Sequence, residues 1–182
     1  SSCKNAPVGK FVAAGRRDQH ARRVRSPDAE RRPRMKILVL CYEYPPIGGG
    51  GVMSGIAIAA KALKPDVRII GVQSANVSWV KPSLAEGRPV VPKTKPTIAD
   101  GIAVKTPGEL TLPIIRQYVD DIVEVDDEQI AEAIFHSVQN NRLVVEGAGA
   151  AGLAAVLANK IAIAPDDCVC VVLCGGNIDA NL

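Results

Sequence analysis

Aromatic side chains are scarce in this chain of 182 residues, of which they make up 3%. A core must therefore be built from Ala, Val, Ile and Leu, which suits helices packed on a parallel sheet better than an aromatic-rich β-sandwich or a stacking surface for single-stranded nucleic acid. Long apolar runs are lacking too, because residues 56–63 are interrupted by Lys61 and fall far short of the roughly 20 residues that span a bilayer. We therefore expect no nucleic-acid partner and no membrane partner.

Cysteine spacings typical of zinc sites or disulfide frameworks are also absent from the sequence. The five cysteines are an odd number, and no Cys-x-x-Cys pair occurs among them. Cys168, Cys170 and Cys174 are spaced to share one face of a strand, where we expect Cys168 and Cys170 to be reduced, buried, structural thiols. Since no secretory signal peptide is recognised, we expect a reducing cytoplasmic location.

Basic residues concentrate at the start of the sequence. Residues 1–34 hold ten Lys and Arg against three Asp and Glu, whereas residues 35–182 are acidic on balance. The first segment has too little apolar periodicity to offset the entropy of ordering, so we interpret it as a disordered basic extension ahead of an internal start at Met35. A basic arm for nucleic acid and an Arg-rich transit peptide are the functional alternatives.

Strand-like and helix-like segments alternate from Met35 onward. The expected strands are residues 36–41, 67–73, 121–125, 143–145 and 169–173, and the expected helices are residues 52–64, 112–119, 126–138 and 147–159. Residues 78–108 contain many prolines without a clear period and are expected to be irregular. This alternation predicts a three-layer α/β fold, with a mostly parallel sheet and helices on both faces.

Four consecutive glycines separate the first expected strand from the first expected helix; they are Gly48, Gly49, Gly50 and Gly51. Without Cβ atoms, their backbone N–H groups can face one point at the positive end of a helix dipole, which is a geometry that binds phosphate. Neither the Gly-x-Gly-x-x-Gly dinucleotide pattern nor the Gly-Lys-Ser/Thr of a nucleotide P-loop fits this segment. A glycine linker or tight turn without a ligand is the alternative.

Six motifs extend this pattern along the chain; they are residues 48–57, 70–74, 97–101, 119–123, 146–150 and 174–179. In order and spacing they resemble the C-terminal half of threonine dehydratase (threonine ammonia-lyase), a pyridoxal-phosphate enzyme of the tryptophan-synthase-β-like fold. The resemblance implies an incomplete version of that fold over residues 48–182 and pyridoxal 5'-phosphate as cofactor. It also implies a small amino-acid substrate, threonine or serine, a role in isoleucine biosynthesis, and a homo-oligomer for the intact family.

The resemblance implies roles for matching positions only. The loop Gly48–Gly51 would hold the cofactor phosphate, Cys174 would lie beside the pyridine nitrogen, and Glu146 would lie near the ring. Simple packing is the alternative for Cys174, and a carboxylate favoured by a helix dipole is the alternative for Glu146. Related serine racemases bind a divalent cation through acidic residues at positions that align with Gln73 and Trp79, so we expect no metal site here.

Two motifs of the family are missing from the sequence. The Schiff-base lysine in its Ser-x-Lys-x-Arg context and the Ser-x-Gly-Asn substrate loop do not occur before the glycines, and no later lysine has that context. We therefore assign no catalytic residue and expect the chain alone to be an inactive, truncated enzyme. The alternatives are a non-catalytic phosphate-binding or pyridoxal-phosphate-binding fragment, a degenerate fusion product, and a serine dehydratase or racemase-like enzyme.

The segment before the glycines resembles a different family. Residues 35–50 are similar to the opening strand and glycine loop of a glycosyltransferase with two Rossmann domains, so a glycosyltransferase fragment is a further alternative. The likeness indicates a fusion through a shared glycine run, either natural or produced by sequence assembly. The domains expected are residues 1–34, 35–47 and 48–182.

Because a basic segment with little apolar content has nothing apolar to pack, we predict that removing residues 1–34 leaves the melting temperature nearly unchanged. Thermal unfolding of the full chain and of a variant that begins at Met35 tests this. A drop of several degrees would show that the segment packs on the rest of the protein.

Overall fold

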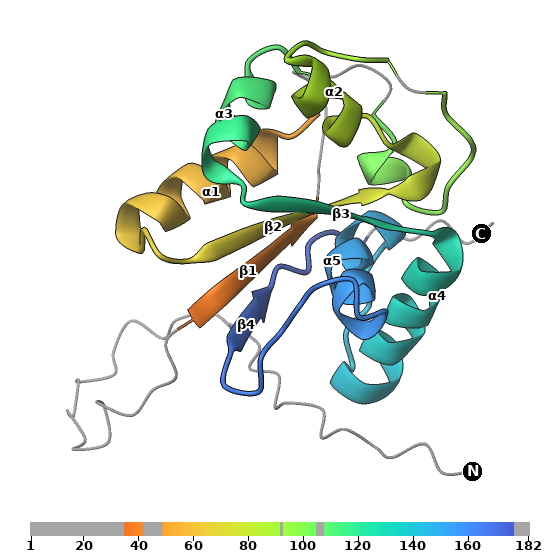
Figure 1. Ribbon diagram of the computed structural model, residues 1–182. Coiled ribbons are helices and arrows are strands. Elements are labelled where there is room, and N and C mark those ends of the chain that lie inside the picture. Colours follow the sequence, from red (N-terminus) through yellow and green to blue (C-terminus); the bar gives the residue numbers. More distant parts are fainter. Residues whose placement is uncertain (1–34, 42–48, 92, 105–107, 177–182) are drawn as a thin grey trace, which may run out of the picture. The chain divides into compact units, whose positions relative to one another are not determined.

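The computed structural model describes residues 35–41, 49–91, 93–104 and 108–176, which form an α/β unit (Figure 1). The basic extension expected over residues 1–34 and residue Gly48 of the glycine loop lie outside these ranges. The elements are β1 (Met35–Cys41), α1 (Gly51–Leu63), β2 (Arg68–Ser74), α2 (Val80–Glu86), α3 (Thr111–Tyr118), β3 (Asp121–Val125), α4 (Asp127–His136), α5 (Gly147–Leu157) and β4 (Cys168–Val171). Short 3-10 turns lie at Ala75–Val77 and Asp100–Ile102, and a π turn lies at Ser137–Asn141.

The four strands of the described chain are all parallel and lie in the order β3-β2-β1-β4. Val39 of the central strand β1 lies opposite Ile70 of β2 on one side and opposite Val171 of β4 on the other. Continuous apolar runs in β1 and β2 explain their place in the middle, since a strand covered on both faces is apolar throughout. The prediction of a mostly parallel sheet is confirmed.

Helices cover both faces of this sheet. Figure 1 shows α1, α2 and α3 on one side and α4 and α5 on the other. Met53 and Ala57 of α1 are fully buried, and every residue of α5 from Gly147 to Ala155 is buried. The core is therefore mostly aliphatic, with Trp79 as its largest fully buried side chain. The predicted three-layer α/β class is confirmed.

None of the helices in the described ranges is long and apolar enough to cross a membrane.

The segment expected to be irregular contains the helix α2. Pro82, one of the prolines behind that expectation, lies in the first turn of α2, where the N–H that proline lacks would have no acceptor within the helix. Gly87 then ends the helix in the left-handed region, with φ of 69°. The prediction of an irregular excursion is therefore wrong for this part, because proline is compatible with the start of a helix.

The strand expected at residues 143–145 does not form. No strand of the described chain pairs with this segment, in which Val144 is exposed and Val145 is buried. A β-prone sequence needs a neighbouring backbone to become a strand, and this one has none in the sheet order above.

The predicted acidic cap of α4 is confirmed, because Asp126 accepts a hydrogen bond from the Gln129 N–H at 2.9 Å and Gln129 in turn accepts one from the Asp126 N–H.

The cysteines of β4 are less buried than expected. Cys168 is partly exposed and Cys170 is exposed, because β4 is an edge strand of the described sheet and only its valines pack on the core. Partial desolvation raises the pKa of the Cys170 thiol, and the neighbouring Cys168 raises it further. Cys174 lies beyond the end of the strand rather than on its face. The prediction of buried thiols on one strand face is wrong.

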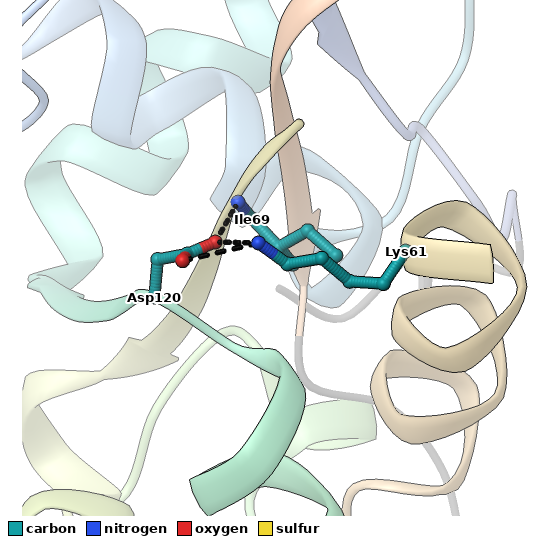
Figure 2. A network of polar contacts seen from close by, with 3 residues as sticks. All are labelled: Lys61, Ile69 and Asp120. Atoms are coloured by element: carbon teal, nitrogen blue, oxygen red, sulfur yellow. Dashed lines mark hydrogen bonds and ion pairs between the residues drawn. The ribbon is translucent and has the colours of Figure 1, made fainter. Parts of the chain in front are cut away.

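Asp120 joins three elements of the fold (Figure 2). Its carboxylate accepts a hydrogen bond from the Ile69 N–H of β2 at 2.7 Å and pairs with the Lys61 Nζ of α1 at 2.8 Å. The Asp120 N–H donates in turn to the Ile69 carbonyl at 2.9 Å. Asp120, which directly precedes β3, thus binds the N–H and the carbonyl of Ile69 in β2 and the Lys61 side chain in the last turn of α1.

We predict that Asp120→Ala lowers the free energy of unfolding by about 2 kcal/mol, because a backbone N–H loses a charged acceptor. Lys61→Met should lower it by less than about 1 kcal/mol, since a partly exposed ion pair is weak. Urea denaturation measures both values. An equal loss in the two variants would show that the ion pair, rather than the backbone hydrogen bond, carries the stabilisation.

Candidate functional site

Two of the expected site segments follow neighbouring strands. Residues 49–51 come after β1, and residues 174–176 come after β4. Since β1 and β4 are adjacent and parallel, their carboxyl ends lie at the same edge of the sheet, and the Val172 N–H continues the pairing to the Val39 carbonyl at 3.1 Å. Ligands of open α/β sheets bind at this edge. The fold thus places both segments where a ligand site is expected.

The glycines form the N-terminus of α1. Gly50 is the N-cap, with φ of 99° in the left-handed region that favours glycine, and its carbonyl accepts the first helical hydrogen bond from the Ser54 N–H. Within the described residues, α1 has no side-chain cap and no acidic residue in its first turn. The N–H groups of that turn therefore lack acceptors within the helix, and the positive end of the dipole is not neutralised. A Cβ on Gly51 would meet no atom of the described residues within 4 Å, so none of them fills the space beside Gly51.

Ser54 adds a polar group to this end of α1. The residue is 4% exposed, and its hydroxyl has no hydrogen-bond partner in the described part of the chain. Leaving a buried hydroxyl without a partner costs about 1–3 kcal/mol, so such groups usually meet a ligand or water. Together with the uncapped N–H groups, this hydroxyl fits an anionic group such as a phosphate.

Thr111, the first residue of α3, contacts the same loop from another element. The residue is 8% exposed, and its Oγ1 lies 2.6 Å from the Gly49 carbonyl oxygen and 3.2 Å from that of Gly108. Nothing in the local sequence distinguishes Thr111 from an ordinary residue at a helix start. Only the fold shows its contact with a loop 62 residues earlier.

Glu146 and the segment after β4 meet at the N-terminus of α5. Glu146 is the N-cap of α5, and its N–H donates to the Gly175 carbonyl at 3.2 Å. Gly149, in the first turn, lies so close to the Cys174 carbonyl oxygen that a Cβ there would overlap it. Glu146 and Cys174 are both partly exposed. The structure therefore brings these two predicted site residues together, while their roles toward a cofactor stay predictions.

The lysines of the described chain do not lie in buried pockets. Lys61 pairs with Asp120 as shown above, and Lys64 is partly exposed. The other described lysines are exposed; they are Lys36, Lys81, Lys93, Lys95 and Lys160. Lys105 lies outside the described residues. None of the described lysines has the desolvated surroundings that activate a lysine as a nucleophile.

Gln73 and Trp79, the two positions on which the expected lack of a metal site rests, are both buried. The Gln73 amide donates to Ser78 Oγ at 2.8 Å and to Glu124 Oε1 at 3.1 Å, and its oxygen accepts from the Val80 N–H at 3.1 Å. Gln73 thus ties the end of β2 to β3 and α2. No group of three or more residues able to hold a metal ion occurs within the described ranges. The expected lack of a metal site stays a prediction.

Comparisons with known proteins identify the family. A family model described as pyridoxal-phosphate dependent enzyme matches residues 44–175. The L-threonine ammonia-lyase of Thermotoga maritima is 47% identical over 137 residues, which are 75% of this chain and 34% of that protein. A solved threonine deaminase from T.th. has a TM-score of 0.69 at 37% identity, covering 80% of this chain and 51% of its own. Maize serine racemase has a TM-score of 0.71 at 34% identity, with coverage of 84% and 46%.

This chain spans 34% of the length of the Thermotoga relative. The family match covers residues 44–50 of the segment expected to be glycosyltransferase-like, and that origin is not shown by these matches and stays a prediction for residues 35–43. From residue 44 to residue 175 the likeness is continuous, and it includes the glycines that open α1, Glu146 and Cys174. The chain belongs to the family of pyridoxal-phosphate dependent enzymes.

Proposed function

We propose that this chain forms the phosphate-binding and ring-nitrogen side of the cofactor site of a threonine dehydratase-like enzyme, which converts L-threonine to 2-oxobutanoate and ammonia. The observation that carries the proposal is the uncapped N-terminus of α1, with the open space at Gly51 and the buried Ser54 hydroxyl. Its place at the same sheet edge as Cys174 supports it further. The similarity to threonine ammonia-lyase supports the choice of substrate.

In this proposal the glycine loop binds the cofactor phosphate through backbone N–H groups of residues 48–51. Each hydrogen bond to a charged oxygen contributes roughly 1.5–3 kcal/mol, so three or four of them outweigh the cost of immobilising the ligand. The uncompensated dipole of α1 adds attraction for the phosphate charge. The loop thereby fixes one end of the cofactor mainly through backbone groups, to which the Ser54 hydroxyl adds one side-chain contact.

Cys174 is proposed to face the pyridine nitrogen, and Glu146 to lie near the ring. Pyridoxal phosphate supplies an electron sink for the negative charge that develops on the substrate. A neutral thiol at Cys174 leaves the ring nitrogen without a proton, whereas an aspartate would keep it protonated. Elimination of a leaving group needs less carbanion stabilisation than a protonated ring gives, so a thiol suits this reaction.

A serine dehydratase or racemase-like activity is the second candidate. The likeness to maize serine racemase favours it. The buried Gln73 amide, which bonds to Ser78, Glu124 and Val80, stands against it if this position matches a metal-binding carboxylate, as the resemblance to serine racemases implies. We also propose a reducing cytoplasmic setting, in keeping with the unpaired thiols of Cys168 and Cys170.

The phosphate position is tested with two matched variants of α1. Gly51→Ala and Gly55→Ala each add one Cβ at an exposed position with no atom within 4 Å, so both should fold. We predict that Gly51→Ala weakens pyridoxal phosphate binding by about tenfold, because its Cβ would enter the space proposed for the phosphate and would displace the phosphate from one backbone donor. Gly55→Ala should bind like the parent. Equal affinity of all three in a fluorescence titration would show that the phosphate does not lie on this loop.

We also propose that the 182-residue chain by itself does not release ammonia from threonine. The elimination needs a lysine bound to the cofactor, and the described lysines are exposed, partly exposed or paired with Asp120. An ammonia assay on the purified chain with added pyridoxal phosphate tests this. Ammonia release that hydroxylamine abolishes would contradict the prediction and would mean that one of the lysines named above serves the reaction.

A further inference from the structure

We propose that Thr111 is a positioning residue for the cofactor phosphate, because its hydroxyl holds the Gly49 carbonyl so that the Gly50 N–H faces the phosphate. This inference rests on the proposed function of the glycine loop. It adds a residue from α3 to a site that is otherwise formed by the backbone of the loop and the start of α1.

The Thr111 hydroxyl has two carbonyl oxygens in reach but only one proton. The Gly49 oxygen lies at 2.6 Å and the Gly108 oxygen at 3.2 Å. Gly108 already accepts a hydrogen bond from the Leu112 N–H at 3.1 Å. Because the contact with the Gly49 oxygen is shorter and the Gly108 oxygen already has a donor, we assign the hydrogen bond of the Thr111 hydroxyl to the Gly49 oxygen.

The contact also sets the direction of the Gly50 N–H, because the peptide between Gly49 and Gly50 is planar. In a trans peptide the carbonyl and the following N–H point in opposite directions, so fixing the Gly49 oxygen toward α3 directs the Gly50 N–H away from it. Glycines on both sides of the peptide leave its rotation almost free of steric limits. The Thr111 hydroxyl is a contact from outside the loop that helps to keep this N–H in one orientation.

Thr111 meets the requirements of a fixed anchor. Its neighbours Leu112 and Ile115 are buried in the core, so α3 cannot move away without exposing apolar surface. Thr111 itself is buried, which prevents water from replacing its hydroxyl as the donor. Losing the hydroxyl would let the glycine peptide rotate and would remove one donor from the phosphate site.

The test uses the full chain and titrations with pyridoxal phosphate and, separately, with inorganic phosphate. Thr111→Val keeps the shape of the side chain but removes the donor, and we expect it to raise both dissociation constants by about tenfold. Thr111→Ser keeps the donor and should stay within about threefold of the parent. Ser137→Ala is the matched control, because Ser137 is a buried hydroxyl that donates to the Ala133 carbonyl at 2.8 Å in α4. It should lower the melting temperature without changing either affinity.

The outcomes separate this inference from the proposed function. If the parent binds, Gly51→Ala weakens binding and Thr111→Val does not, the role of Thr111 is wrong and the proposed function stands. If the parent binds neither ligand, both are wrong. If Thr111→Val does not fold, Thr111→Ala replaces it, and equal affinity of the Ala and Ser variants would overturn the inference. If affinity falls in parallel with the melting temperature in all variants, including Ser137→Ala, the inference would also be overturned.

Discussion

The backbone pairing between β1 and β4 decides where a site can form in this protein. These strands belong to opposite ends of the described chain, and each is followed by one of the two segments that form the proposed cofactor site. Their parallel register puts both segments at the same side of the sheet, and α5 closes that side. The close approach of Gly149 to the Cys174 carbonyl shows how little space is left there. A shift of either strand would therefore separate the glycine loop from Cys174, the two segments to which we propose the cofactor binds.

The central strand is also the part of the sheet that the family match leaves out. The match begins at residue 44, after the end of β1, yet Ile37, Leu38 and Val39 are buried between both neighbours. A buried parallel strand contributes backbone hydrogen bonds and apolar bulk, and it needs no particular side chain. The burial of β1 therefore depends on its apolar side chains and on its pairing with β2 and β4, while the fusion expected from the sequence stays a prediction.

Local patterns predicted the elements well where one short segment decides its own structure. The apolar runs of the central strands, the acidic cap at Asp126 and the glycines before α1 all belong to this kind. Prediction failed where a neighbour decides the result, as in residues 143–145, which lack a strand to pair with, and in Cys170, whose strand lies at an edge. Thr111 could not be found for the same reason, because its proposed role depends on a contact with a loop far away in the sequence.

The strand order has a consequence for how the protein folds. β1 precedes β2 in the chain and lies beside it in the sheet, whereas its other neighbour, β4, is the last strand of the described chain. Contacts between distant segments form slowly, since a long loop must close before they stabilise anything. We therefore expect β1 to pair with β4 later than with β2. An apolar strand edge that stays unpaired invites association with other chains. Pairing with β4 should therefore lower the tendency to aggregate, and in the same step it brings Cys174 to the edge of the sheet that carries the glycine loop.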